Sequence, residues 1–163
     1  MGVVKANLFF KSQIIKGPVI ILDGLLTPEN IGSALRLAAN IACQKIIITE
    51  RVELKQSKIE RIARNSLQYL EIVFLTYKEI SEQFNHLIAI ETCSEAKNIY
   101  KTTLPIDVAF IVGNEKYGIS EELLSRTHQQ VFIPMPGPVK SLNVSHALSI
   151  ALFEWYRQNY VKP

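Results

Sequence analysis

The sequence predicts an α/β fold, a mostly parallel sheet with helices on both faces, and two observations lead to it. Six short runs rich in Ile, Val and Phe alternate along the chain with segments of helical periodicity. Several of these runs are apolar on both alternating faces, which is typical of strands buried on both sides. A repeated strand-helix order implies parallel strands, because each return to the same edge of a sheet requires a crossover.

The predicted elements follow one another without an interior domain boundary, an internal repeat or a low-complexity tract. With 163 residues, 48% of them hydrophobic, we expect one domain over residues 1–163, with residues 1–17 as an amino-terminal extension. The predicted strands are 18–23, 45–49, 71–75, 86–91, 107–113 and 130–134. The predicted helices are 30–42, 57–65, 78–84, 95–101, 119–126 and 143–160. Function in such folds collects in the loops beyond the carboxyl ends of the strands, so we expect the functional residues there.

Composition narrows the class of protein. The formal net charge of +3 permits an RNA partner but does not require one. Cys43 and Cys93 are far apart, and neither has a second cysteine nearby, so we expect reduced, buried thiols and no metal site. The chain has no apolar run of about 18 residues and no signal-peptide pattern, so we expect a cytoplasmic protein that does not bind membranes.

The first predicted strand is followed by a helix start. Thr27 can cap free amides through its hydroxyl, and Pro28 suits a first helical turn. Small and apolar residues at helical spacing predict a buried stripe, made of Ile31, Ala34, Leu35, Ala38 and Ala42. Arg36 lies on another face of this helix; an arginine in such a place is more often a surface residue than a functional one.

The fifth predicted strand runs into the segment GNEKYGISEELL. This segment is neither a dinucleotide fingerprint nor a phosphate-binding loop. Glu115 comes directly after the buried strand, where a carboxylate either accepts amide hydrogen bonds and holds the turn or binds a ligand. Ser120 predicts the start of the next helix.

The segment IPMPGPVKSLNVS joins the last predicted strand to the last helix. Its three prolines make the loop stiff and remove amide donors, which suits a cradle for a flat ligand with polar edges. Ser141 and Asn143 stand at the helix amino terminus, where free amides favour negative charge. Plain capping of the helix by either side chain is the alternative.

Taken together, NIGSALRLA (30–38), IVGNEKYGIS (111–120) and IPMPGPVKSLNVSHALSIALFE (133–154) resemble the three motifs of the SpoU, or TrmH, branch of the SPOUT RNA methyltransferases. The resemblance implies a deep trefoil knot over about residues 111–150 that holds S-adenosyl-methionine in a bent conformation. It also implies a homodimer and 2′-O-methylation of a ribose in tRNA or rRNA. The chain resembles the minimal, tRNA-acting kind most, with an rRNA enzyme or a catalytically silent RNA-binding homologue as alternatives.

The resemblance also assigns residues. The positions that match the family's active site are Asn30, Arg36, Glu115, Ser141 and Asn143. Those assigned to the methyl-donor pocket are Thr92, Gly113, Ile133, Met135 and Leu142. We expect Arg36 to clamp the ribose hydroxyl electrostatically rather than act as a base, because a guanidinium with a pKa above about 12 stays protonated near neutral pH. The proton would then pass to phosphate or water.

A small domain that binds RNA needs a surface for phosphates. The predicted basic patch consists of Arg51, Lys55, Lys58, Arg61 and Arg64. The alternative is a solvated helix face, partly neutralised by Glu53 and Glu60.

The terminal helix carries many large apolar side chains. Leu148, Leu152, Trp155 and Tyr156 share one stripe, and Phe153 lies on a neighbouring face. The core of one monomer can absorb part of such a stripe, and an interface can use the remainder. We therefore predict a two-fold homodimer in which this helix and the first-motif region pack against their counterparts.

Overall fold

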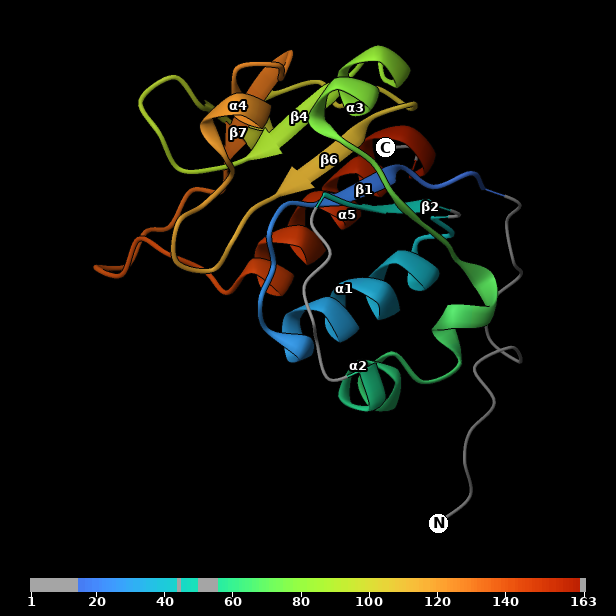
Figure 1. Cartoon of the computed structure of the whole chain (residues 1–163). Coiled ribbons are helices and arrows are strands. Elements are labelled where there is room, and N and C mark those ends of the chain that lie inside the picture. Colours follow the sequence, from blue (N-terminus) through green and yellow to red (C-terminus); the bar gives the residue numbers. More distant parts are fainter. Residues whose placement is uncertain (1–14, 44, 50–55, 162–163) are drawn as a thin grey trace.

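The computed structural model describes residues 15–43, 45–49 and 56–161, which form one sheet of seven parallel strands with helices on both faces (Figure 1). The strands are β1 (Val19–Leu22), β2 (Lys45–Ile48), β3 (Glu71–Phe74), β4 (Leu87–Ile90), β5 (Lys97–Asn98), β6 (Ala109–Val112) and β7 (Gln129–Phe132). The helices are α1 (Pro28–Asn40), α2 (Gln56–Ala63), α3 (Tyr77–Gln83), α4 (Glu121–Leu124) and α5 (Val144–Tyr160). Two 3-10 segments are η2 (Arg64–Tyr69) and η3 (Ile99–Lys101). The predicted fold class is therefore confirmed.

The strand order is β3-β2-β1-β6-β4-β7-β5, and every neighbouring pair is parallel. The first three strands extend the sheet in one direction from β1, and the later strands extend it in the other from β6. The order therefore switches between β1 and β6. In open parallel sheets, ligands bind beyond the carboxyl ends of the strands at such a switch point.

The core has two layers, one on each face of the sheet. On β1, Ile20 and Leu22 point into the layer covered by α1 and α5, while Ile21 points into the layer covered by α3 and α4. Figure 1 shows α3 and α4 above the sheet, α1 below it and α2 outside α1. Both faces of the central strands are thus buried, which explains why their sequences are apolar at every position.

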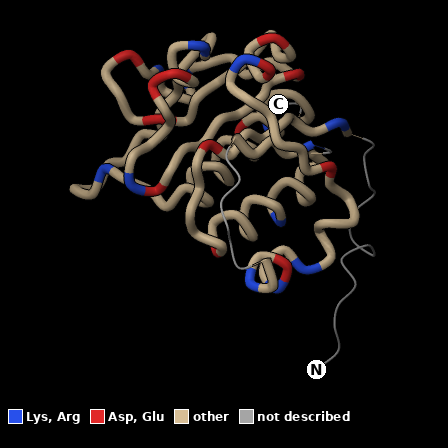
Figure 2. Tube along the Cα trace, viewed as in Figure 1, with Lys and Arg blue, Asp and Glu red and all other residues tan. Residues whose placement is uncertain are grey.

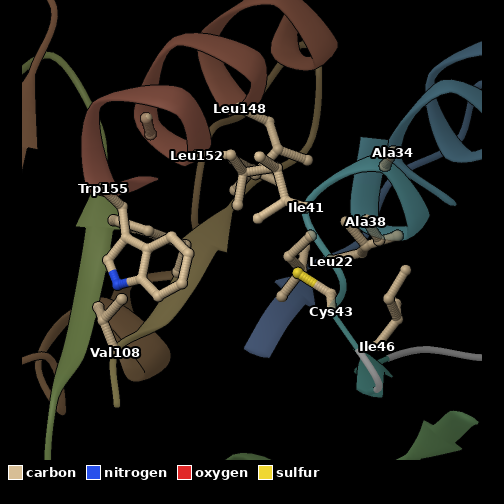
Figure 3. Packing of buried hydrophobic residues seen from close by; sticks show 14 of the residues in the cluster. Leu22, Ala34, Ala38, Ile41, Cys43, Ile46, Val108, Leu148, Leu152 and Trp155 are labelled. Atoms are coloured by element: carbon tan, nitrogen blue, oxygen red, sulfur yellow. The ribbon is translucent and has the colours of Figure 1, made fainter. Parts of the chain in front are cut away.

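The α1 stripe is confirmed in its helical part, because Ile31, Ala34, Leu35 and Ala38 are buried. Ala42 lies beyond the helix end, in a left-handed conformation with φ 56°. Cys43 follows it into the core (Figure 3), as predicted, and burial raises the pKa of its thiol to about 12. Cys93 is half-buried, and both cysteines are free.

The inward face of α5 is part of the monomer core, which is the use predicted for part of its apolar stripe, while its use at an interface stays a prediction. Leu148, Leu152 and Trp155 are fully buried; the two leucines lie next to Ile41, whereas Trp155 lies beside Val108, just before β6 (Figure 3). The Trp155 indole Nε1 donates a hydrogen bond to the carbonyl oxygen of Pro105 at 3.0 Å. Of the apolar residues named for the interface, Phe153 is the exposed one, at 49%.

The predicted helix over 95–101 is wrong. This segment forms the short edge strand β5, paired with β7, followed by η3. The Asn98 side chain accepts a hydrogen bond from the Tyr100 amide at 2.9 Å, and the Thr102 hydroxyl donates to the Asn98 carbonyl at 2.9 Å. Such local side-chain bonds compete with helical hydrogen bonding and end the segment after one turn.

Two other helices are shorter than predicted. The helix predicted over 57–65 ends at Ala63 and is followed by η2, which begins at Arg64, a residue with a φ of 52°. The helix predicted over 119–126 contains only the four residues of α4. None of the helices within 15–43, 45–49 and 56–161 is both long and apolar enough to cross a membrane.

Candidate functional site

A cavity of about 690 Å³ lies beyond the carboxyl ends of β4, β6 and β7. Its apolar part is formed by the last residues of these strands and the residue after β7, namely Ile90, Val112, Phe132 and Ile133. The remaining walls come from the start of α1, the turn after β6, the loop 133–143 and the start of α5. The three sequence motifs therefore meet at one cavity beside the switch point of the sheet.

Glu115 and two asparagines connect the three motifs. The Glu115 carboxylate accepts hydrogen bonds from the Asn30 side-chain amide at 2.9 Å, from the Thr27 amide at 3.1 Å and from the Leu26 amide at 3.2 Å. Asn30 in turn accepts through its Oδ1 a bond from Asn143 Nδ2 at 3.0 Å. Both roles predicted for Glu115, holding a turn and lining a ligand site, are thus compatible with its position.

The hydrogen bonds fix the charge of Glu115. Partial burial alone would raise the pKa of this carboxyl group, but the bonds from the Asn30 side chain and from backbone amides outweigh burial and lower the pKa to about 2. Glu115 is therefore ionised at neutral pH, and three donors already occupy its oxygens. A carboxylate with so low a pKa suits a positioning role and is a poor general base.

The starts of α1 and α5 differ from each other in how they are capped. Thr27 is the residue before α1, as predicted, but its hydroxyl makes no capping bond. Its carbonyl oxygen accepts from the Asn30 and Ile31 amides at 3.0 and 3.1 Å, and its own amide donates to Glu115. Asn143 caps α5 by accepting from the Ser145 amide at 2.8 Å. It therefore combines the capping role with its bond to Asn30, while Ser141 stands exposed two residues earlier on the cavity wall.

All five residues assigned to the donor pocket line the cavity, namely Thr92, Gly113, Ile133, Met135 and Leu142. Gly113 shows why one of them must be small: a Cβ atom there would collide with the backbone of Gly118 and Ile119. The missing side chain therefore lets the end of the turn pack directly against the end of β6.

Four charged residues of the cavity were not predicted from the sequence: Glu29, Glu91, Lys116 and Lys140. Glu91 accepts bonds from the Thr92 amide at 3.0 Å and from the Ile119 amide at 3.2 Å. The Lys140 ammonium donates to the carbonyl oxygen of Met135 at 2.8 Å and so closes the proline-rich loop. Glu91 ends a predicted strand, and the reasoning that selected Glu115 could have found it.

Comparison with known proteins identifies the family. The sequence model of the SpoU rRNA Methylase family matches residues 17–153. The chain belongs to this family. It is 30% identical over 147 residues to the 23S rRNA (guanosine-2′-O-)-methyltransferase RlmB of Pasteurella multocida strain Pm70, a match that covers 86% of this chain. The match spans 60% of the length of that relative.

Solved structures share the fold. A structure described as giving insights into the 2-OH methylation of C/U34 on tRNA has a TM-score of 0.77 and 26% identity, over 86% of this chain and 95% of that one. The SpoU methyltransferase AviRb from Streptomyces viridochromogenes, in complex with AdoMet, has a TM-score of 0.80 and 21% identity, over 100% of this chain and 64% of that one. This SpoU-family chain therefore has the α/β fold of that family, while the threading of its knot stays a prediction.

Arg36 lies apart from the cavity of this SpoU-family chain. The structure brings the other four predicted active-site residues to the cavity wall, whereas Arg36 is exposed on α1 and is not part of the lining. It follows Glu29, which does line the cavity, by seven residues on the same helix face, or about 10 Å along the axis. No other described residue forms an ion pair with Arg36.

The predicted basic patch is described only in part, because Arg51 and Lys55 lie outside the described residues. Lys58 forms an ion pair with Glu29 of α1, while Arg61 and Arg64 are exposed. Acidic and basic residues stand next to each other at α2 (Figure 2). Lys58 therefore fits the predicted alternative, in which acidic residues partly neutralise this face. The contact of the basic patch with RNA stays a prediction. Within the described ranges, no group of three or more His, Cys, Asp or Glu residues could hold a metal ion.

Proposed function

We propose that this chain transfers a methyl group from S-adenosyl-methionine to the 2′-hydroxyl of a ribose in structured RNA, with tRNA as the substrate. The observation that carries the proposal is the chain of bonds from Glu115 through Asn30 to Asn143, which joins the three motifs beside a cavity lined by the donor-pocket residues. The bound AdoMet of the structural relative AviRb supports the choice of cofactor.

The cavity fits such a donor. The apolar residues at the strand ends offer a surface for an adenine ring, and polar backbone and side-chain groups of the surrounding loops lie beside it. S-adenosyl-methionine supplies a methyl group that is already activated by a sulfonium. The protein must therefore align the acceptor oxygen with that methyl group and stabilise the emerging alkoxide.

Different residues of the cavity perform the alignment and the charge stabilisation. Ionised Glu115 orients the Asn30 amide, and Asn30 orients Asn143, so that the start of α5 is held against the turn after β6. Ser141 presents a hydroxyl at the amino terminus of α5, where the helix dipole stabilises negative charge. Arg36 completes the site from outside by clamping the ribose hydroxyl, and the proton passes to phosphate or water.

The position of Arg36 supports a homodimer in this proposal. An exposed arginine about two turns from the cavity of its own chain can act at the cavity of a second copy. The carboxyl-terminal segment, about residues 111–150, forms the knot that keeps the proline-rich loop in place, and the enzyme acts in the cytoplasm. Preference for tRNA over rRNA is supported by the relative described with tRNA, of which this chain covers 95%, compared with 60% of the rRNA enzyme.

The test is methyl transfer from labelled S-adenosyl-methionine to unfractionated tRNA and, separately, to total rRNA. We expect label in tRNA, at a linkage that resists alkaline cleavage because its 2′-oxygen is blocked. Ser141→Ala should lower the rate about tenfold or more, and Ser125→Ala, at an exposed serine outside the cavity lining, should leave it unchanged. Label in rRNA alone would show that rRNA, and not tRNA, is the substrate. Binding of both the cofactor and RNA without methyl transfer would show a catalytically silent homologue.

A further inference from the structure

Tyr117 is the most exposed large hydrophobic residue among those that the structure describes, at 75%. It lies on the turn between β6 and α4, two residues after Glu115 and directly after Lys116, and both of these line the cavity. The proposed catalytic roles do not involve this ring. This aromatic ring is therefore exposed next to residues that line the cavity, where a ligand can cover it.

The turn that carries Tyr117 is held in place by many bonds. Asn114 and Gly118 exchange two backbone hydrogen bonds of 2.9 Å, and the Asn114 side-chain oxygen accepts from the amides of Lys116 and Tyr117 at 2.9 and 3.1 Å. Gly118 adopts the positive φ of 73° that this tight turn needs. The backbone below the ring is therefore fixed before any ligand binds.

Two buried or partly buried carboxylates hold the end of the same turn. Asp23, which is 3% exposed, accepts from the Ser120 amide at 2.7 Å, and Glu91 accepts from the Ile119 amide at 3.2 Å. Because the turn is fixed at both ends, a ligand that contacts Tyr117 costs little backbone ordering.

The surroundings of the ring indicate the chemistry of its partner. The Lys116 ammonium lies 4.9 Å from the centre of the Tyr117 ring, so a cation and an aromatic face stand side by side. The sequence neighbours Glu115 and Lys116 are charged, and the apolar surface here is a single ring rather than a patch that would fit a protein. A nucleotide matches both features, because its base stacks on aromatic rings and its phosphate binds ammonium groups.

We propose that Tyr117 is a stacking platform for a base at or next to the nucleotide to be methylated, and that Lys116 contacts the adjoining phosphate. This inference rests on the proposed function and deepens it. Stacking on the rim would hold an unpaired base outside the cavity while its ribose enters toward Ser141 and Asn143. Tyr117 is accordingly a residue for RNA binding and positioning, without a part in binding the methyl donor.

Fluorescence can test the stacking directly. The chain has a single tryptophan, Trp155, which is fully buried, so Tyr117→Trp adds one exposed indole at the turn. We expect unfractionated tRNA to quench this added emission, because a base stacked on an indole quenches it. The matched control is Tyr100→Trp, at a tyrosine that is 52% exposed, also adjoins a lysine and lies outside the cavity lining; its emission should not change.

A binding and kinetic series gives the second readout. Tyr117→Ala should weaken tRNA binding about ten- to a hundredfold and raise the KM for tRNA, while Tyr117→Phe should restore both. Affinity for S-adenosyl-methionine should stay the same in all variants, and Tyr100→Ala should behave like the wild type.

The outcomes separate this inference from the proposed function. Methyl transfer by the wild type without quenching in Tyr117→Trp, or with an unchanged KM in Tyr117→Ala, overturns the platform and leaves the function standing. Quenching by both tRNA and rRNA without methyl transfer supports the platform and removes the proposed function. Loss of RNA binding together with a change in sedimentation of Tyr117→Ala would show that the ring serves contact between two copies of the chain, and this also overturns the platform.

Discussion

At the scale of single residues, the site depends on a carboxylate whose partners come from elsewhere in the chain. Glu115 lies 85 residues or more from the groups that donate to it, which are the backbone amides of Leu26 and Thr27 and the side-chain amide of Asn30. One side chain thereby holds the segment that leads into α1, orients the Asn30 amide and forms part of the cavity wall.

This arrangement predicts a specific dependence of stability on pH. The folded state lowers the pKa of Glu115 from 4.5 to about 2, so ionised Glu115 stabilises the fold above about pH 4.5 and this contribution is lost as the pH falls toward 2. Glu115→Gln cannot titrate. We expect the difference in free energy of unfolding between wild type and Glu115→Gln to be largest near neutral pH and to shrink across that window.

The measurement is urea denaturation of both proteins at several pH values between about 6 and 2.5. The comparison cancels the other acidic groups, because these are the same in the two proteins. A difference that stays constant over the whole window would mean that Glu115 is not held by ionic hydrogen bonds.

At the scale of elements, the position of α2 is set by contact with α1. A Cβ atom at Gly32 of α1 would lie 2.7 Å from the Ile62 Cβ atom and 3.1 Å from the carbonyl oxygen of Ile59, both on α2. The two helices approach closely because Gly32 has no side chain, and the ion pair between Lys58 and Glu29 joins them at the rim of the cavity.

Gly32→Ala should therefore destabilise the protein. Alanine improves helix propensity by about 1 kcal/mol, but overpacking against α2 costs about 1 to 3 kcal/mol, so we expect a net loss of up to about 2 kcal/mol. Urea denaturation measures it. Gly137→Ala is the control, because no atom lies within 4 Å of an added Cβ there, and it should change stability by less than about 0.5 kcal/mol. Equal behaviour of both variants would show that α2 can move without cost.

At the scale of the whole molecule, the monomer core uses more of α5 than its apolar composition indicated. With Leu148, Leu152 and Trp155 buried, the case for a homodimer depends on the exposed Phe153 and on Arg36, which lies outside the cavity of its own chain. A dimer built on the outer face of α5 and the first-motif region agrees with both.

Mixing experiments test this arrangement. If Arg36 acts at the cavity of a second copy, Arg36→Ala and Asn143→Ala proteins are each inactive, whereas a re-equilibrated equal mixture regains about a quarter of wild-type activity, because half of its dimers hold one intact site. Phe153→Arg should shift sedimentation toward the monomer, and Ile72→Arg, on the edge strand β3, should not. Full activity of a dilute monomer, or a mixture that stays inactive although mixed dimers form, would contradict the assignment.

The sequence alone was enough to predict most of the architecture and most of the residues that line the cavity. The central strands can be recognised in the sequence as apolar runs, because burial on both faces excludes polar side chains along their whole length. The segments at 30–38, 111–120 and 133–154 resemble the family motifs, and nine of the ten residues that this resemblance assigns to the active site and donor pocket line the cavity. Both features can be recognised within each segment's own sequence.

The tertiary structure decided whatever depends on contacts between distant segments. It formed β5 beside β7 where a helix was expected, left the Thr27 hydroxyl without a capping bond, buried Leu148, Leu152 and Trp155 of α5 in the monomer core and placed Arg36 outside the cavity. At β5, a local helix preference worth a fraction of a kcal/mol per residue competes with burial and hydrogen bonds supplied from elsewhere in the chain, which are worth more. The residue types of each segment could be read from the sequence alone, whereas long-range packing fixed which of them line the cavity and which partners hold them there.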